Sequence, residues 1–289
     1  ESLFLEEKIN NSKVILLSFL TAFLIGIRIV GLLICFQYLI SIVVLFNIKK
    51  IDINDFIKKN WKFFLIFTIS LFIFIYILNP IFWHNPLVES INSITVMSKY
   101  WNEICTLTLG TCMNSFNLPS SYYFIWLFFK LPILIIIGIL LFPFVEKKIF
   151  NETPASIYYL TLLISFFLIL FIFILKNVAV YDELRHVLFL VPLIFLIGLT
   201  NLFYFNKKLF IGLGSLVIFF FFLENFSLYP YQYTWLNSFA KFTNIQKNFE
   251  IDYWGVSNKN LAKKIVQYAK ENSINKDTCV YGDIFAKDF

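Results

Sequence analysis

The chain has 289 residues, of which 59% are hydrophobic, 20% aromatic and only 15% charged, and its mean hydropathy is +0.77. Soluble domains are nearer to roughly 45–50% apolar with about a quarter of their residues charged, so this composition indicates a polytopic membrane protein. The net charge of +6 does not indicate nucleic-acid binding. The lysines cluster between apolar segments, and no soluble basic domain is visible.

Seven apolar segments are long enough, or nearly so, to cross a hydrocarbon core of about 30 Å as helices of roughly 20 residues. They are 14–27, 30–46, 63–79, 123–145, 157–176, 186–204 and 209–225. The first two segments share a joint at Arg28 and Gly31, which predicts two helices that meet near one membrane face. The predicted fold class is an all-α polytopic membrane protein with about seven transmembrane helices.

The lysine-rich segments define the predicted topology. Segments 47–62, 146–156 and 205–208 all fall on one side together with residues 1–13, and the positive-inside rule assigns that side to the cytoplasm. The opposite side receives Arg28, the loop 80–122, the hinge 177–185 and the tail 226–289. The sequence therefore predicts a transmembrane domain over 1–225 and an extracytoplasmic tail over 226–289.

Both ends of the chain predict an internal piece of a larger protein. The sequence begins with Glu1 rather than Met, and it ends at Phe289 within a segment whose pattern is that of a folding soluble region. No signal sequence precedes the first span. We therefore expect residues essential to the function to lie outside these 289.

Cysteine and histidine spacing carries limited information. If the outer side is oxidising, Cys105 and Cys112 can close a small disulfide loop, but spacing alone does not decide whether they do. No zinc site is expected, because His84 and His186 are the only histidines and neither has ligand spacing to a cysteine pair.

The outer loop 80–122 is the first candidate for chemistry. Prolines on both sides hold His84 and its neighbour Trp83 at the membrane interface, where an aromatic belt is the simpler interpretation of the tryptophan. Residues 87–103 have the apolar spacing of an amphipathic helix lying along the membrane surface, which can border the entrance for a lipid-linked substrate. Tyr122 and Tyr123 then return the chain to the membrane.

The run from Tyr181 to His186 is the second candidate. Asp182, Glu183 and Arg185 can pair with one another as a solvated hairpin between spans, and this is the favoured interpretation of Glu183. Arg185 and His186 begin the next predicted span, where a charge costs about 2.5–3.5 kcal/mol on insertion scales. Two interpretations of Arg185 stay open: a bidentate ligand for a phosphate, or a side chain that snorkels to anionic headgroups.

The tail shows the start of a small extracytoplasmic α/β segment. Leu261, Ile265 and Tyr268 have helical spacing against several lysines, which predicts a soluble amphipathic helix over 258–272. Residues 280–283 have the pattern of a strand that ends in a turn.

Taken together, four stretches resemble the GT-C superfamily of multi-spanning membrane glycosyltransferases, the group that includes protein O-mannosyltransferases and lipid A aminoarabinose transferase, and more closely a bacterial branch of it. They are Gly26-Ile-Arg28 with Gly31, Leu118-Pro-Ser-Ser-Tyr-Tyr123 leading to Leu131-Pro132, Arg185-His186 with Pro192, and the tail from Tyr229 to Gly255. The sequence departs from the family pattern at Ser120 and Ser121, where an aromatic pair is usual, so the acceptor contacts there are undefined.

The resemblance implies transfer of a sugar from a polyprenyl-phosphate donor to a protein, lipid or glycan acceptor at the outer face of a bacterial inner membrane. It implies an acidic catalytic residue upstream of Glu1, so no residue of this chain receives that role. Donor-phosphate contacts are expected from Arg185, His186 and Arg28, and Asp182, His84, Tyr122 and Tyr123 are candidates for lining the site. A divalent metal is compatible with this chemistry, but no residue here is assigned to it.

Two other classes of function stay open. A transporter or flippase for a lipid-linked or anionic substrate would also place charges near broken helices, although no inverted repeat is visible in the seven segments. A noncatalytic membrane scaffold is the third possibility.

Overall fold

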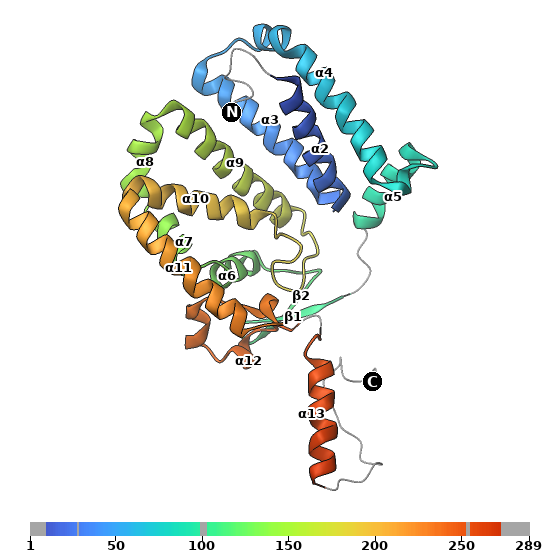
Figure 1. The fold of residues 1–289 in the computed structure, drawn as a ribbon, viewed down its shortest axis with the longest axis vertical. Coiled ribbons are helices and arrows are strands. Elements are labelled where there is room, and N and C mark those ends of the chain that lie inside the picture. Colours follow the sequence, from blue (N-terminus) through green and yellow to red (C-terminus); the bar gives the residue numbers. More distant parts are fainter. Residues whose placement is uncertain (1–9, 28, 99–102, 253–254, 273–289) are drawn as a thin grey trace. The chain divides into compact units, whose positions relative to one another are not determined.

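The computed structural model describes residues 10–27, 29–98, 103–252 and 255–272 (Figure 1). Contacts divide the chain into two units whose segments alternate along the sequence. Unit 1 comprises Glu1–Glu103, Ile137–Ala179 and Phe189–Lys207, and unit 2 comprises Ile104–Ile136, Val180–Leu188 and Lys208–Phe289. The predicted boundary at residue 225 lies within unit 2.

The N-terminal helices of unit 1 have the predicted joint. Helix α2 (Asn11–Ile27) is followed by the short 3-10 helix η1 (Ile29–Leu32) and by α3 (Leu33–Lys49). Gly31 is required at this joint, because a Cβ atom there would lie 2.5 Å from the carbonyl oxygen of Leu24. Helix α4 (Ile53–Leu78) packs along α2 and begins ten residues before the predicted span at 63, since the Asp52 side chain caps it by accepting from the Asn54 amide at 2.7 Å.

A surface helix follows α4, as the sequence predicts for 87–103. The 3-10 helix η2 (Pro80–Phe82) leads into α5 (Pro86–Ser98). Leu87 and Ile91 on α5 are 80% and 62% exposed, so the apolar side of this helix is not packed against the described residues. The Trp83 indole donates to the Tyr76 carbonyl at 2.7 Å and fixes the turn between α4 and α5.

Three further helices complete unit 1: α8 (Phe142–Asn151), α9 (Thr153–Leu175) and α10 (Leu190–Phe205). Both α3 and α10 pack on α9. Val44, Leu45, Phe56 and Ile157 form a buried apolar cluster contributed by α3, α4 and α9. Van der Waals packing of such side chains contributes to the cohesion between these helices.

The segment 123–145, predicted as one span, is broken in the structure. Helix α6 (Ser121–Lys130) ends before Pro132, and α7 (Ile133–Leu140) leaves it at a bend of 118°. Proline has no amide hydrogen and disfavours helical backbone in the residue before it, and Leu131 is accordingly extended at φ −87° and ψ 139°.

Three described helices are long and apolar enough to cross a membrane, namely α4, α9 and α11 (Lys207–Ser227), and the bent α6–α7 pair makes a fourth if it counts as one span. The predicted spans at 14–27, 30–46 and 186–204 correspond to the shorter apolar helices α2, α3 and α10. The chain is thus mainly helical, with apolar helices suited to a membrane, whereas seven full-length spans are not present in the described residues.

Unit 2 contains a β-hairpin that the all-α prediction missed. Strand β1 (Cys105–Thr108) pairs antiparallel with β2 (Thr111–Asn114). The remaining elements are the 3-10 helices η3 (Gln232–Thr234) and η4 (Ser238–Phe242), and the helices α12 (Ile245–Asn248) and α13 (Asn258–Glu271). Helix α13 confirms the helix predicted for 258–272, and the strand predicted for 280–283 lies outside the described residues.

Aromatic side chains form the centre of unit 2. Trp126 of α6 is fully buried and lies with its ring centroid 5.4 Å from that of Phe249, which in turn lies 4.8 Å from Phe129. The Trp126 indole donates to the Thr108 hydroxyl at 3.1 Å. Helix α6, the hairpin and the segment after α12 are therefore held together by one aromatic cluster.

Candidate functional site

The loop that carries the Tyr181–His186 run is anchored by three buried apolar residues. Val180, Leu184 and Val187 are each at most 3% exposed. Tyr181, Asp182, Arg185 and His186 are half-buried and alternate with these anchors. The spacing therefore fixes the loop in unit 2 while leaving one polar group of residues partly accessible.

Arg185 and His186 precede the helix that corresponds to the predicted span 186–204, rather than beginning it. Residues 183–189 form turns, and α10 begins only at Leu190. Asp182 and Glu183 both have left-handed backbone, with φ of 54° and 64°. Left-handed conformation in a residue other than glycine costs of the order of 1–3 kcal/mol and tends to occur at functional sites, where the surrounding structure enforces it.

Arg185 is the centre of the partly accessible group. Its Nη2 lies 3.1 Å from Asp182 Oδ2 and 3.1 Å from His186 Nε2. Its Cζ lies 4.8 Å from the centroid of the Tyr181 ring, and that ring is 4.3 Å from the imidazole ring of His186. An ion pair, a hydrogen bond and a cation–π contact together set the position of the guanidinium.

The contact with Arg185 also defines the hydrogen-bonding role of one His186 ring nitrogen. A guanidinium has only donors, so His186 Nε2 accepts from it at 3.1 Å. Partial burial raises the pKa of the Asp182 carboxyl, and the positive charge of Arg185 opposes that rise. A carboxylate, a guanidinium and an imidazole therefore meet within the five residues from Asp182 to His186.

Glu183 is buried, contrary to the expectation of a solvated hairpin. The residue is 4% exposed, and its Oε2 lies 2.6 Å from Nζ of Lys130 on α6. Burial raises the pKa of the Glu183 carboxyl to about 7; Lys130 opposes this, and Asp182 and Glu250 add to it. The expectation failed because Lys130, a distant residue in sequence, replaces water as the partner of the carboxylate.

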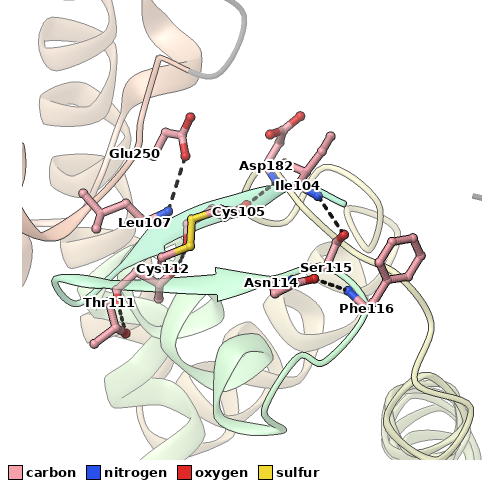
Figure 2. The surroundings of a disulfide bond; sticks show 12 residues. Ile104, Cys105, Leu107, Thr111, Cys112, Asn114, Ser115, Phe116, Asp182 and Glu250 are labelled. Atoms are coloured by element: carbon pink, nitrogen blue, oxygen red, sulfur yellow. Dashed lines mark hydrogen bonds between the residues drawn. A yellow bond between two sulfur atoms is a disulfide. The ribbon is translucent and has the colours of Figure 1, made fainter. Parts of the chain in front are cut away.

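The hairpin supports the same loop (Figure 2). A disulfide joins Cys105 to Cys112 across its two strands, which resolves the alternative left open by their spacing. Its two-residue turn has positive φ at both Leu109 (49°) and Gly110 (77°), as a type I′ turn requires. The Gly110 amide donates to the Asn248 carbonyl at 3.1 Å, so the turn is tied to the segment after η4.

Hydrogen bonds then connect the hairpin and α6 to the loop backbone. The Asp182 amide donates to the Thr106 hydroxyl at 3.2 Å, and the Tyr122 hydroxyl donates to the Glu183 carbonyl at 3.1 Å. Glu250 also contacts β1, since its carboxylate accepts from the Leu107 amide at 3.3 Å (Figure 2). The two strained residues are thus held by both neighbouring elements.

The other predicted site residues have mixed placements. Tyr122 and Tyr123 are buried in unit 2, and Tyr122 contacts the Tyr181–His186 loop. His84 is exposed between η2 and α5 in unit 1. Arg28 lies outside the described residues. The structure therefore brings together Arg185, His186 and Asp182, with Tyr122 beneath them.

Sequence reasoning missed Lys130 and Thr106. Lys130 had a usable signal, because it is a charged residue in the middle of a predicted span and lies two residues before Pro132. Thr106 had none, since its role depends on a hairpin whose contact with the loop is 76 residues distant.

The arrangement offers a guanidinium that can bind an anion and an imidazole nitrogen that accepts a hydrogen bond. No group of three or more potential metal ligands occurs among the residues described here. No protein-family model, curated protein or solved structure matches this chain. The function proposed below therefore rests on the residues themselves and on the resemblance of their motifs.

Proposed function

We propose that this chain is part of an integral membrane glycosyltransferase, which moves a sugar from a polyprenyl-phosphate donor to an acceptor at the outer face of a bacterial inner membrane. One observation carries the proposal: the guanidinium of Arg185 is held, partly accessible, between Asp182, His186 and the Tyr181 ring. Apolar helices of membrane-spanning length in the same chain supply the setting for a lipid-linked donor.

The chemistry of the transfer explains the need for a cation. An acceptor oxygen attacks the anomeric carbon of the sugar, the bond from that carbon to the phosphate oxygen breaks, and the acceptor's proton passes to a base. The electron pair of the broken bond stays on the leaving phosphate, whose negative charge increases. A guanidinium positioned beforehand stabilises that developing charge, and its planar fork suits phosphate oxygens.

Asp182 and His186 affect the charge and the orientation of the Arg185 guanidinium. Asp182 partly neutralises the guanidinium in the absence of a ligand, so a phosphate competes with the Asp182 carboxylate for the same donors. His186 Nε2 accepts from the guanidinium and so orients Nη2. The family resemblance implies an acidic catalytic base, and that role is not assigned to a residue of this chain.

Removal of the guanidinium tests the proposal. In the full-length protein in nanodiscs, undecaprenyl phosphate should bind more tightly than undecaprenol, and Arg185→Ala should weaken binding of the phosphate roughly 10–100-fold without changing binding of the alcohol. Sugar transfer from a polyprenyl-phosphate donor should be lost in membranes that contain this variant. Arg185→Lys should rescue poorly, because a lysine lacks the bidentate fork.

A matched control removes a cation elsewhere in unit 2. Lys241 has a 65% exposed side chain and pairs with Glu224, so Lys241→Ala lowers the net charge equally without touching the loop. If Lys241→Ala and Arg185→Ala have equal effects, or if the phosphate and the alcohol bind wild-type protein alike, the proposal is wrong.

The bent α6–α7 pair favours a second candidate, a transporter or flippase. Broken helices with charges at the break are common at transporter sites, and Lys130 lies at the end of α6 next to a bend of 118°. A donor labelled in the sugar distinguishes the two functions. A transferase moves the label to an acceptor, whereas a flippase moves the intact labelled donor between leaflets.

A further inference from the structure

The Lys130–Glu183 ion pair joins three segments of unit 2. Lys130 Nζ lies 2.6 Å from Glu183 Oε2 and donates to the Tyr233 carbonyl at 2.8 Å. Both side chains are largely enclosed, at 14% and 5% exposed. The loop, α6 and the tail segment before η4 therefore meet at one buried ammonium group.

The Lys130–Glu183 ion pair is expected to add little to the net free energy of folding. The attraction between two buried charges is largely offset by their desolvation, and apolar residues of similar size are often as good or better. Glu183 Oε1 is buried and accepts no hydrogen bond from the described residues. Two consecutive left-handed residues, Asp182 and Glu183, add backbone strain at the same place.

The strained residues set the geometry of the anion site. Asp182 forms the ion pair with Arg185, and its own backbone direction depends on that of Glu183, the next residue. Glu183 is held from α6 by both the Lys130 side chain and the Tyr122 hydroxyl. Loss of the ion pair would let the loop relax from the left-handed conformation and move Asp182 and Arg185.

We propose that Lys130 and Glu183 are positioning residues of the anion site, whose ion pair holds the left-handed backbone at 182–183 and thereby places Arg185 to bind the phosphate of a lipid-linked donor. The inference rests on the proposed function. Both side chains are largely buried, so neither residue contacts the donor. They act through Asp182 and Arg185.

Three variants of the full-length protein separate positioning from folding. Lys130→Met and Glu183→Leu each leave one buried charge without its partner, and each should lower the Tm by roughly 10 °C. The double variant removes both charges and should recover most of the Tm. Binding of undecaprenyl phosphate should remain roughly 10–100-fold weaker in the double variant than in wild-type protein, because the ion pair is absent.

A pair with a purely structural role predicts the opposite binding result for the double variant. If recovery of the Tm also restores binding of undecaprenyl phosphate to within about threefold of wild type, the positioning role is wrong. If the double variant does not fold, Glu183→Gln decides, since it keeps the side-chain shape. Weaker phosphate binding by this variant at a temperature where it is fully folded supports the positioning role, and unchanged binding overturns it.

The same measurements distinguish failure of this inference from failure of the proposed function. If wild-type protein binds undecaprenyl phosphate no better than undecaprenol, the anion site itself is wrong and this inference falls with it. If Arg185→Ala abolishes the preference for the phosphate but the double variant keeps it, only the role of Lys130 and Glu183 is wrong.

Discussion

Different kinds of interaction stabilise each of the two units internally. In unit 1, apolar helices pack around residues such as Val44 and Phe56, and the buried hydroxyl of Thr161 donates to a carbonyl one turn earlier in its own helix. In unit 2, a disulfide, ion pairs and hydrogen bonds between distant residues surround a short hairpin and the Tyr181–His186 loop.

Unit 1 is therefore stabilised mainly by helix packing, whereas the candidate site in unit 2 depends on specific polar contacts. Helices that satisfy their own backbone groups can be specified by apolar surface and small residues, as is usual in membranes. The loop with two left-handed residues forms turns of its own, and it is also held from outside by Thr106, Tyr122 and Lys130. The stability of unit 2 should accordingly fall when single polar or covalent contacts are lost. The stability of unit 1 should fall when the volume of a packed side chain changes.

The largest expected effect of this kind is removal of the disulfide. Cys105 and Cys112 are seven residues apart in sequence, and a cross-link that closes so short a loop stabilises by roughly 2–3 kcal/mol. Replacing both with serine should lower the free energy of unfolding of unit 2 by about that amount. It should also loosen Thr106, and with it the Asp182 amide. Thermal unfolding in detergent measures the loss.

Cys35 provides the matched control for the disulfide. It is a free thiol on α3 in unit 1, so Cys35→Ser changes one sulfur to oxygen without breaking a cross-link. Equal destabilisation by Cys35→Ser and by the double replacement would show that the disulfide contributes nothing special to unit 2.

The sequence was sufficient for most helices because their signals are local. The joint near Gly31, the surface helix after Pro86 and the tail helix from Asn258 were all predicted and are present. The break at Pro132 had a local signal too, since proline ends a helix, but the strongly apolar residues on both sides concealed it. The hairpin was missed because four-residue strands in a long polar loop carry little periodicity.

Only the part of the candidate site that depends on contacts between sequence neighbours was predictable. Asp182, Arg185 and His186 are neighbours in sequence, so their clustering follows from the loop itself. The burial of Glu183 does not, because it depends on Lys130, which is 53 residues away in the sequence. Left-handed backbone at Asp182 and Glu183 also had no signal, since neither residue is glycine.

A glycine pair tests unit 1 at intermediate magnitude. A Cβ atom on Gly138 of α7 would lie 2.3 Å from the carbonyl oxygen of Gly198 on α10, so the two helices approach through small residues. Gly138→Ala should destabilise unit 1 by about 1–3 kcal/mol, because backbone must move to admit the methyl group. Thermal unfolding in detergent again measures the effect.

Gly214 of α11 is the control, since nothing lies within 4 Å of a Cβ atom built there. Gly214→Ala should be neutral or stabilise by up to about 1 kcal/mol through its better helix propensity. If both alanines have the same effect, the close approach of α7 and α10 is not what stabilises unit 1.

The smallest expected effect is a gain of stability at the hairpin turn. Leu109 has φ of 49° and is 42% exposed, so a residue that avoids left-handed backbone occupies the first position of a type I′ turn. Leu109→Asn creates the Asn-Gly pair that this turn favours and should stabilise unit 2 by roughly 1 kcal/mol. Leu109→Ala removes the same exposed apolar surface but keeps the unfavourable backbone, so it should give no such gain. If both variants stabilise equally, exposed leucine rather than backbone strain limits the hairpin, and the contrast between a strained unit 2 and a packed unit 1 loses part of its basis.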